Sequence, residues 1–122
     1  LDEAESVLSG FNTAISHTGQ AHSEGLVFND EQEIAIEETL LAGLVEISQQ
    51  LKNISYPEGS AVDRNNLVAI SEEVNLHKQE QIQCMKTGNY DCYQSEYNMF
   101  MDSLGRLFDY YNNMVDSFNQ KY

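Results

Sequence analysis

Apolar residues recur along this chain at spacings of three and four, the period that places them on one face of an α-helix. Alternation of apolar and polar residues, the period of a half-buried strand, is not sustained for more than a few residues, and the only proline is Pro57. Four stretches carry the helical period. The pattern predicts helices at about residues 2–19, 30–54, 60–87 and 91–121.

The first two predicted helices begin at acidic residues, which complement the positive end of a helix dipole. Asp2 and Glu5 form a capping box at the first, and Asn29 or Asp30 caps the second. Residues 19–29 contain two glycines and are predicted to form the connecting loop. The apolar faces comprise Ala4, Val7, Leu8, Phe11 and Ile15 in the first helix, and Leu40, Leu44, Ile47, Leu51 and Ile54 in the second.

The last two predicted helices differ in the apolar faces they present. In the third, two polar residues, His77 and Gln81, interrupt the face. Gly88 suits a left-handed helix end, and Asp91 with Gln94 forms a capping box that begins the fourth helix. The fourth helix has the longest apolar face of all, and this predicts that it is the central helix. Its residues are Tyr93, Tyr97, Phe100, Leu104, Leu107, Tyr111, Met114 and Phe118.

Four helices joined by short links predict an all-α fold, an up-and-down antiparallel four-helix bundle with a C-terminal helical hairpin. The 122 residues are one domain's worth of chain, so residues 1–122 are expected to form a single helical-bundle domain. The first predicted helix is shorter than the fourth and cannot cover its full length. An aromatic-lined groove is therefore expected beside one end of the fourth helix, unless residues 19–29 cover it.

The two cysteines of the chain, Cys84 and Cys92, flank the predicted turn between the third and fourth helices. A disulfide across such a hairpin is geometrically reasonable, and disulfides persist in oxidising compartments. The sequence therefore predicts an extracytoplasmic location: periplasmic, secreted, or the outer domain of an anchored protein. Two buried thiols in a cytosolic protein are the alternative. No run of 18 apolar residues occurs, so no transmembrane segment is expected in this chain.

The charge of the chain is strongly acidic, with 20 Asp and Glu against six Lys and Arg, a formal net charge of −14. Binding to nucleic acid depends on basic residues that neutralise phosphates, so no nucleic-acid partner is expected. Lys52 is the first basic residue, and the acids before it include Glu31, Glu37 and Glu38 of the second predicted helix. A charged partner should be basic and should approach this acidic part of the surface.

Residue patterns that carry enzyme chemistry are missing from the sequence. It contains no Gly-x-Ser-x-Gly, no Cys-x-x-Cys and no calcium-binding loop. Glu73 and His77 are four residues apart and so are placed to share a metal ion or a hydrogen bond. A histidine whose hydrogen bonds are satisfied by Glu73 or Gln81 is the simpler interpretation. We therefore expect no enzyme activity, no cofactor and no metal.

Tyrosine is the residue type that most favours a binding role, because it is enriched at recognition surfaces. Tyr90, Tyr93, Tyr97, Tyr110 and Tyr122 are the candidate contact residues. We expect an extracytoplasmic, non-enzymatic binding or sensing module that recognises a protein partner or small ligand through these tyrosines or the acidic surface. The alternatives are a cytoplasmic acidic inhibitor that mimics nucleic-acid charge, and a small metal-binding or hydrolytic protein. An exposed helix face can also form a homodimer.

Overall fold

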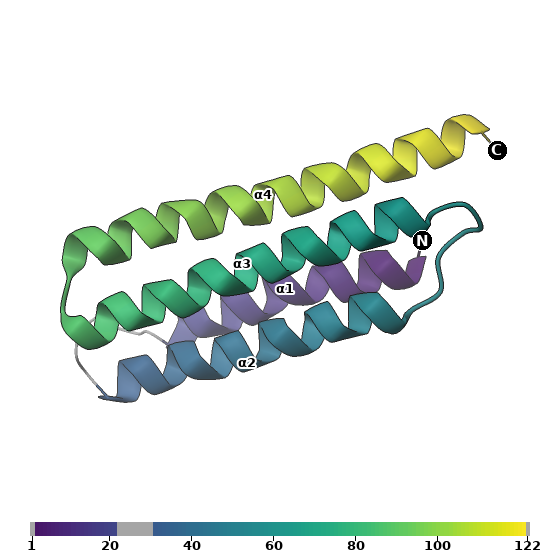
Figure 1. Ribbon diagram of the computed structural model, residues 1–122. Helices are drawn as coiled ribbons and strands as arrows, with labels where there is room; N and C mark the ends of the chain where they lie inside the picture. Colours follow the sequence, from purple (N-terminus) through teal and green to yellow (C-terminus); the bar gives the residue numbers. More distant parts are fainter. Residues whose placement is uncertain (1, 22–30, 122) are drawn as a thin grey trace.

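The computed structural model describes residues 2–21 and 31–121, with all their side chains except those of residues 2, 17–21, 118 and 121. It contains four α-helices and no strand in these ranges: α1 (Asp2–Ala21), α2 (Glu31–Asn53), α3 (Ala61–Thr87) and α4 (Tyr90–Lys121). They run antiparallel in chain order (Figure 1). The predicted all-α bundle is confirmed, and each helix end lies within two residues of its expected position. Most of the predicted 19–29 loop lies outside the described residues.

The central helix of the fold is α3, not α4 as the sequence pattern led us to expect. α3 packs against α4 on one side and α2 on another, while α1 packs against α2 (Figure 1). The reason is the number of faces each helix buries. α4 buries one broad apolar face, whereas α3 also buries polar side chains, of which the sequence pattern placed only Gln81 on the apolar face. These are Ser71, Asn75, Lys78 and Gln81.

All four helices contribute to one apolar core, and the faces predicted from the sequence supply most of it. Phe11 of α1, Leu44 of α2, Leu67 of α3 and Leu107 of α4 are fully or almost fully buried. Burying each such side chain contributes about 1.5 to 3 kcal/mol. No described helix is both long enough and apolar enough to cross a membrane. The helices are therefore held together by burial of one face each, with α3 burying more.

The turn between α3 and α4 is fixed by its backbone and by a disulfide. Gly88 has a φ of 68°, and the N–H groups of Gly88 and Asn89 donate to the carbonyls of Met85 and Cys84. The side-chain oxygen of Asn89 accepts from the N–H of Cys92 at 3.0 Å, so Asn89 caps α4. The predicted capping box of Asp91 and Gln94 is wrong, because α4 begins one residue earlier than expected, at Tyr90. The predicted Cys84–Cys92 disulfide is confirmed, with Cα atoms 5.5 Å apart.

Candidate functional site

One side of α4, near its start, exposes aromatic and sulfur-containing side chains to solvent. Tyr90, Tyr97 and Met101 are separated by seven and four residues, the spacing of a single helix face, and are 61%, 38% and 43% exposed. Tyr93 belongs to the same row, and its ring stacks on that of Tyr97 with centroids 6.3 Å apart. We call these four residues the tyrosine face. Most of the tyrosines predicted to bind a partner lie on this face.

Tyr93 is the partly buried residue of the tyrosine face, and it anchors the face close to Glu37 of α2. Burial raises the pKa of its phenol to about 12, and the negative charge of Glu37 on α2 contributes to the rise. The phenol therefore stays neutral over the physiological pH range. Because its neighbour Tyr97 stacks on it, the anchored ring also limits the freedom of the more exposed one. A pre-ordered aromatic surface loses less conformational entropy when it binds a partner.

Of the two remaining predicted binding tyrosines, Tyr110 does not belong to this face. Tyr110 is partly buried at the other end of the α3–α4 interface, where its hydroxyl donates to Oδ1 of Asp63 at 2.7 Å. The same hydroxyl accepts a hydrogen bond from Nδ2 of Asn66 at 2.9 Å. Tyr110 therefore ties α4 to the first turns of α3. Tyr122 lies outside the described residues.

The three acidic residues expected to form a binding surface on α2 have different environments. Glu31 is exposed in the first turn, and Glu38 is exposed and pairs with Lys86 of α3 at 3.6 Å. Glu37 is only 6% exposed, and its Oε2 lies 3.2 Å from Nζ of Lys78. Glu37 is thus an interior residue, out of reach of a partner on the surface.

Lys78 is the interior cation that balances Glu37, and the sequence analysis missed it. Its Nζ also lies 4.4 Å from the ring centre of Phe100, within the range of a cation–π contact. Burial lowers the pKa of Lys78, and the charge of Glu37 opposes that fall. A signal was present: Lys78 follows Val74 by four residues and precedes Gln81 by three, so it occupies the apolar face of α3. Lys78 serves the core rather than a surface site.

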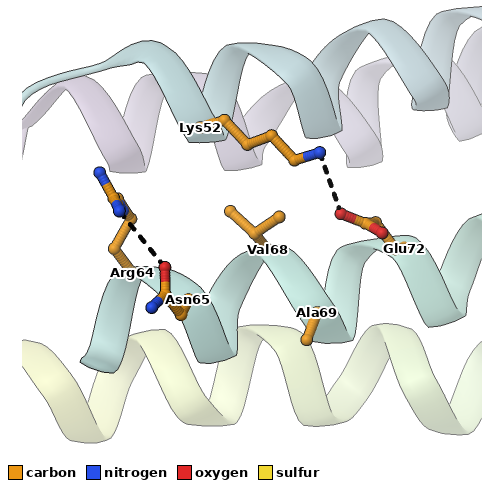
Figure 2. Close-up of a pocket in the computed structure, with 6 residues that line it drawn as sticks. All are labelled: Lys52, Arg64, Asn65, Val68, Ala69 and Glu72. Atoms are coloured by element: carbon orange, nitrogen blue, oxygen red, sulfur yellow. Dashed lines mark hydrogen bonds and ion pairs between the residues drawn. The ribbon is translucent and has the colours of Figure 1, made fainter. Parts of the chain in front are cut away.

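A hollow of about 360 Å³ lies between α2 and α3, near the start of α3 (Figure 2). Two of the six basic residues of the chain line it, but Nζ of Lys52 pairs with Glu72 at 3.3 Å. Nη2 of Arg64 donates to the Asn65 side chain at 3.4 Å. The hollow is open to solvent and its opposite charges are partly matched, so it shows no strong preference for a charged ligand.

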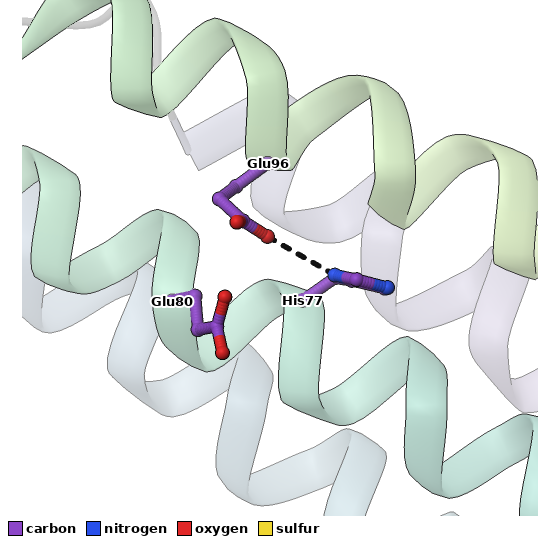
Figure 3. Close-up of side chains that lie close together, drawn as sticks. All are labelled: His77, Glu80 and Glu96. Atoms are coloured by element: carbon purple, nitrogen blue, oxygen red, sulfur yellow. Dashed lines mark hydrogen bonds and ion pairs between the residues drawn. The ribbon is translucent and has the colours of Figure 1, made fainter.

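His77 faces α4 and pairs with a residue that the sequence analysis did not consider. Its Nδ1 lies 3.0 Å from Oε2 of Glu96, and both side chains are largely buried (Figure 3). The expected partner Glu73 is farther away, with Oε1 3.8 Å from Nε2 of His77. Glu73 itself is held by Nη2 of Arg106 at 2.8 Å, and this hydrogen bond lowers the pKa of its carboxyl. Sequence spacing within one helix cannot reveal Glu96, which comes from the neighbouring helix.

Glu80 completes this arrangement, since it lies one turn after His77 on the same side of α3 (Figure 3). One ligand-type atom from each of His77, Glu80 and Glu96 lies within 4.8 Å of the others. A hydrogen bond to Glu96 and the negative charge of Glu96 raise the pKa of the exposed Glu80 carboxyl. An imidazole and two carboxyl groups therefore converge at the α3–α4 groove.

No protein-family model matches this chain, and no curated protein or solved structure matches it at a significant level. Two regions of the described surface carry groups suited to binding: the tyrosine face, and the groove around His77, Glu80 and Glu96.

Proposed function

We propose that this chain is a non-enzymatic binding module that recognises a protein partner through the tyrosine face of α4. The observation that carries the proposal is the solvent exposure of Tyr90, Tyr97 and Met101 on a single helix face, at 61%, 38% and 43%. Helix surfaces with no partner are normally polar. Clustered exposed aromatic and sulfur side chains are typical of protein-binding surfaces.

The residue types of the tyrosine face favour a protein over a small ligand. Tyrosine supplies a large contact area with few rotatable bonds, and it is enriched among the residues that contribute most to protein interfaces. Methionine adapts its shape to a partner, which suits Met101 at the edge of the row. A small ligand is instead expected in a concave, mostly apolar pocket. The tyrosine face is a convex helix surface, so a partner's groove fits it better.

Charge defines the chemistry expected of the partner. The chain carries a formal net charge of −14, and an acidic partner would be repelled over the approach distance. A surface that combines apolar or aromatic contacts with a basic rim would complement both the tyrosine face and the acids around it. The partner is therefore proposed to be a basic protein with a groove that accepts aromatic side chains.

The disulfide supports an extracytoplasmic setting for this interaction. Cys84 and Cys92 are bonded to each other and the chain has no free cysteine. Disulfides of this kind are rare in the reducing cytosol. A cytoplasmic acidic inhibitor, the main alternative, requires two free thiols. The disulfide therefore favours the extracytoplasmic proposal.

A selection experiment tests the proposal with a defined probe. Peptides displayed on phage are selected against the oxidised protein, and their affinity is measured for the wild type and for the double variant Tyr90→Ser/Tyr97→Ser. We expect basic, aromatic-containing peptides whose affinity falls about tenfold or more in the variant, as for central interface residues. The matched control is Val62→Ser/Leu76→Ser, which removes two exposed apolar side chains, 69% and 49% exposed, from α3.

Two results would contradict the proposal. The first is a set of peptides that bind the wild type and the tyrosine variant equally well. The second is a wild-type dimer in sedimentation equilibrium that the same tyrosine substitutions convert to a monomer, because a second copy of the chain would then cover the face. Circular dichroism of the variants checks that exposed substitutions leave the helices folded.

A further inference from the structure

The groove between α3 and α4 brings together three groups that bind divalent cations. Nδ1 of His77 and Oε2 of Glu96 lie 3.0 Å apart, and an oxygen of Glu80 lies within 4.8 Å of both ligand positions. The three side chains come from two helices and point toward a common region (Figure 3). Zn²⁺ is bound by imidazole nitrogen and carboxylate oxygen at about 2.0 to 2.2 Å, which places neighbouring ligand atoms roughly 3 to 3.5 Å apart. The His77 and Glu96 pair already has that separation.

The position of Glu80 allows the remaining adjustment. Its side chain is exposed and lies beside a hollow of about 270 Å³, which is also lined by Glu96 and by the Cys84–Cys92 disulfide. A change of side-chain rotamer can therefore bring its carboxylate closer without disturbing the core. The same hollow gives water access to the groove. Water molecules would complete the coordination of an ion held by three protein ligands.

The charges of the groove favour a cation at this position. Ligand atoms of Glu80 and Glu96 lie within 4.8 Å of each other, so two carboxylates meet in the groove. A divalent ion between them would satisfy both carboxylates together and offset their mutual repulsion.

Glu73 and Arg106 lie on the Nε2 side of the His77 ring. Oε1 of Glu73 lies 3.8 Å from Nε2, on the far side of the ring from Glu96, and Arg106 of α4 holds Glu73 at 2.8 Å. An ion bound at Nδ1 requires the tautomer with the ring proton on Nε2, and the negative charge of Glu73 near Nε2 stabilises that tautomer. Metal-binding histidines commonly pair their second nitrogen with a carboxylate in this way.

We propose that His77, Glu80 and Glu96 bind one Zn²⁺ ion across the α3–α4 groove, with Glu73 and Arg106 positioning the imidazole. This site goes beyond the proposed partner binding and departs from our expectation that the chain binds no metal. That expectation considered only Glu73 as the second ligand to His77. The ion would link the two helices of the hairpin about one turn beyond the disulfide, because Glu96 follows Cys92 by four residues and Glu80 precedes Cys84 by four.

Calorimetric titration of Zn²⁺ into the full, oxidised chain tests the site, and native mass spectrometry gives the stoichiometry. We expect one tightly bound ion, and an affinity reduced about tenfold or more in His77→Gln and in Glu80→Gln. Glu80 is exposed, so its variant keeps the fold even if His77→Gln does not. Glu72→Gln is the matched control, because it removes an exposed carboxylate of α3 that lies outside the cluster.

Three further measurements separate this site from diffuse cation binding and from the tyrosine face. The double variant His17→Gln/His22→Gln should retain the affinity, because only His77 is proposed as a ligand. In nitrogen NMR spectra, Zn²⁺ should shift the Nδ1 signal of His77. Tyr90→Ser/Tyr97→Ser should bind Zn²⁺ as the wild type does. Equal affinity of the wild type, His77→Gln and Glu80→Gln for Zn²⁺, or the absence of a bound ion in the wild type, would overturn the proposal.

Discussion

Two of the ion pairs that join α2 to α3 begin at adjacent residues of α2. Glu37 pairs with Lys78 in the interior, where the side chains are 7% and 4% exposed, whereas Glu38 pairs with Lys86 at the surface, where they are 52% and 46% exposed. The N–O distances are similar, at 3.2 and 3.6 Å. The chemistry of the two pairs is the same. Their environments differ, and the environment determines what each pair contributes to stability.

The interior pair illustrates how burial changes the meaning of a charge. Removing two ions from water is costly, and their attraction only partly offsets that cost. The pair therefore adds little net stability compared with two well-packed apolar residues, but removing one partner leaves an uncompensated charge. The surface pair remains hydrated, so either partner can be lost at little cost. The same type of contact is thus obligatory in one place and dispensable in the other.

The largest effect is expected from breaking the interior pair at Glu37. Glu37→Gln keeps the shape of the side chain but leaves the buried ammonium of Lys78 without its counter-charge. We expect a loss of about 3 to 5 kcal/mol in the free energy of unfolding. Urea denaturation followed by circular dichroism measures it. The double variant Glu37→Leu/Lys78→Met is the control, and it should be close to the wild type or more stable.

The pH dependence of Glu37→Gln provides a second check. Burial already lowers the pKa of Lys78 in the folded protein, and loss of Glu37 removes the charge that opposes this shift. Between the lowered folded pKa and the ordinary lysine value, the unfolded chain holds a proton that the folded chain has released. The variant should therefore regain stability as pH rises through that window. A loss that does not change with pH would mean that an uncompensated Lys78 charge is not its cause.

Loss of the disulfide should have the next largest effect on the free energy of unfolding. The disulfide also distinguishes the two ion pairs, because only one of them has a residue inside the loop that it closes. Cys84→Ser/Cys92→Ser opens a loop with a sequence separation of eight, which should cost about 2 to 3 kcal/mol in the chain-entropy model. Lys86 lies inside this loop and Lys78 does not. Double-mutant cycles in the Cys84→Ser/Cys92→Ser background measure the coupling energy of each pair. We expect the coupling of Glu37 with Lys78 to be preserved and that of Glu38 with Lys86 to be reduced. An unchanged urea midpoint would show that packing alone holds the hairpin.

The fold could be predicted from the sequence because burial of one helix face leaves a periodic record. Spacings of three and four located all four helices, and Gly88 located the turn between α3 and α4. The same method failed for the central helix. A helix that contacts neighbours on two sides accommodates polar residues such as Ser71 and Asn75, whose hydrogen bonds form within the interior. Hydropathy registers those residues as surface.

The candidate sites could be predicted only where a single helix carries them. The tyrosine face was visible because Tyr90, Tyr93 and Tyr97 are close in sequence and belong to one helix. The pairing of His77 with Glu96 was not, because it depends on how α3 and α4 align across their interface. Glu37 was misplaced for a related reason. A pair of adjacent glutamates does not reveal which of the two faces a neighbouring helix.

A smaller effect is expected from the ionisation of Tyr93, and it again distinguishes Glu37 from Glu38. Burial, with a contribution from Glu37, raises the pKa of Tyr93 to about 12, against an ordinary value near 10. Between these values the unfolded chain loses a proton that the folded chain retains, so stability should fall as pH rises through the window. Tyr93→Phe should reduce this fall, measured by urea denaturation at successive pH values.

The absorbance of tyrosinate near 295 nm provides the matched comparison for this titration. Glu37→Gln should lower the pKa of Tyr93, because it removes a negative charge that opposes ionisation of the phenol. Glu38→Gln should leave the pKa unchanged. Subtracting the Tyr93→Phe curve isolates Tyr93 from the other six tyrosines. Equal titration of Tyr93 in the two glutamate variants would show that Glu37 does not act on the phenol.

The smallest effect is expected at the surface pair. Glu38→Gln removes an ion pair whose side chains are half exposed, so we expect a change below about 0.5 kcal/mol in the free energy of unfolding. Added salt screens exposed charges, and the difference from the wild type should therefore vanish at 1 M NaCl, where the Debye length is about 3 Å. The larger loss in Glu37→Gln should persist under the same conditions, because salt does not reach a buried charge. A loss at Glu38 as large as that at Glu37 would mean that burial does not determine the difference between the two pairs.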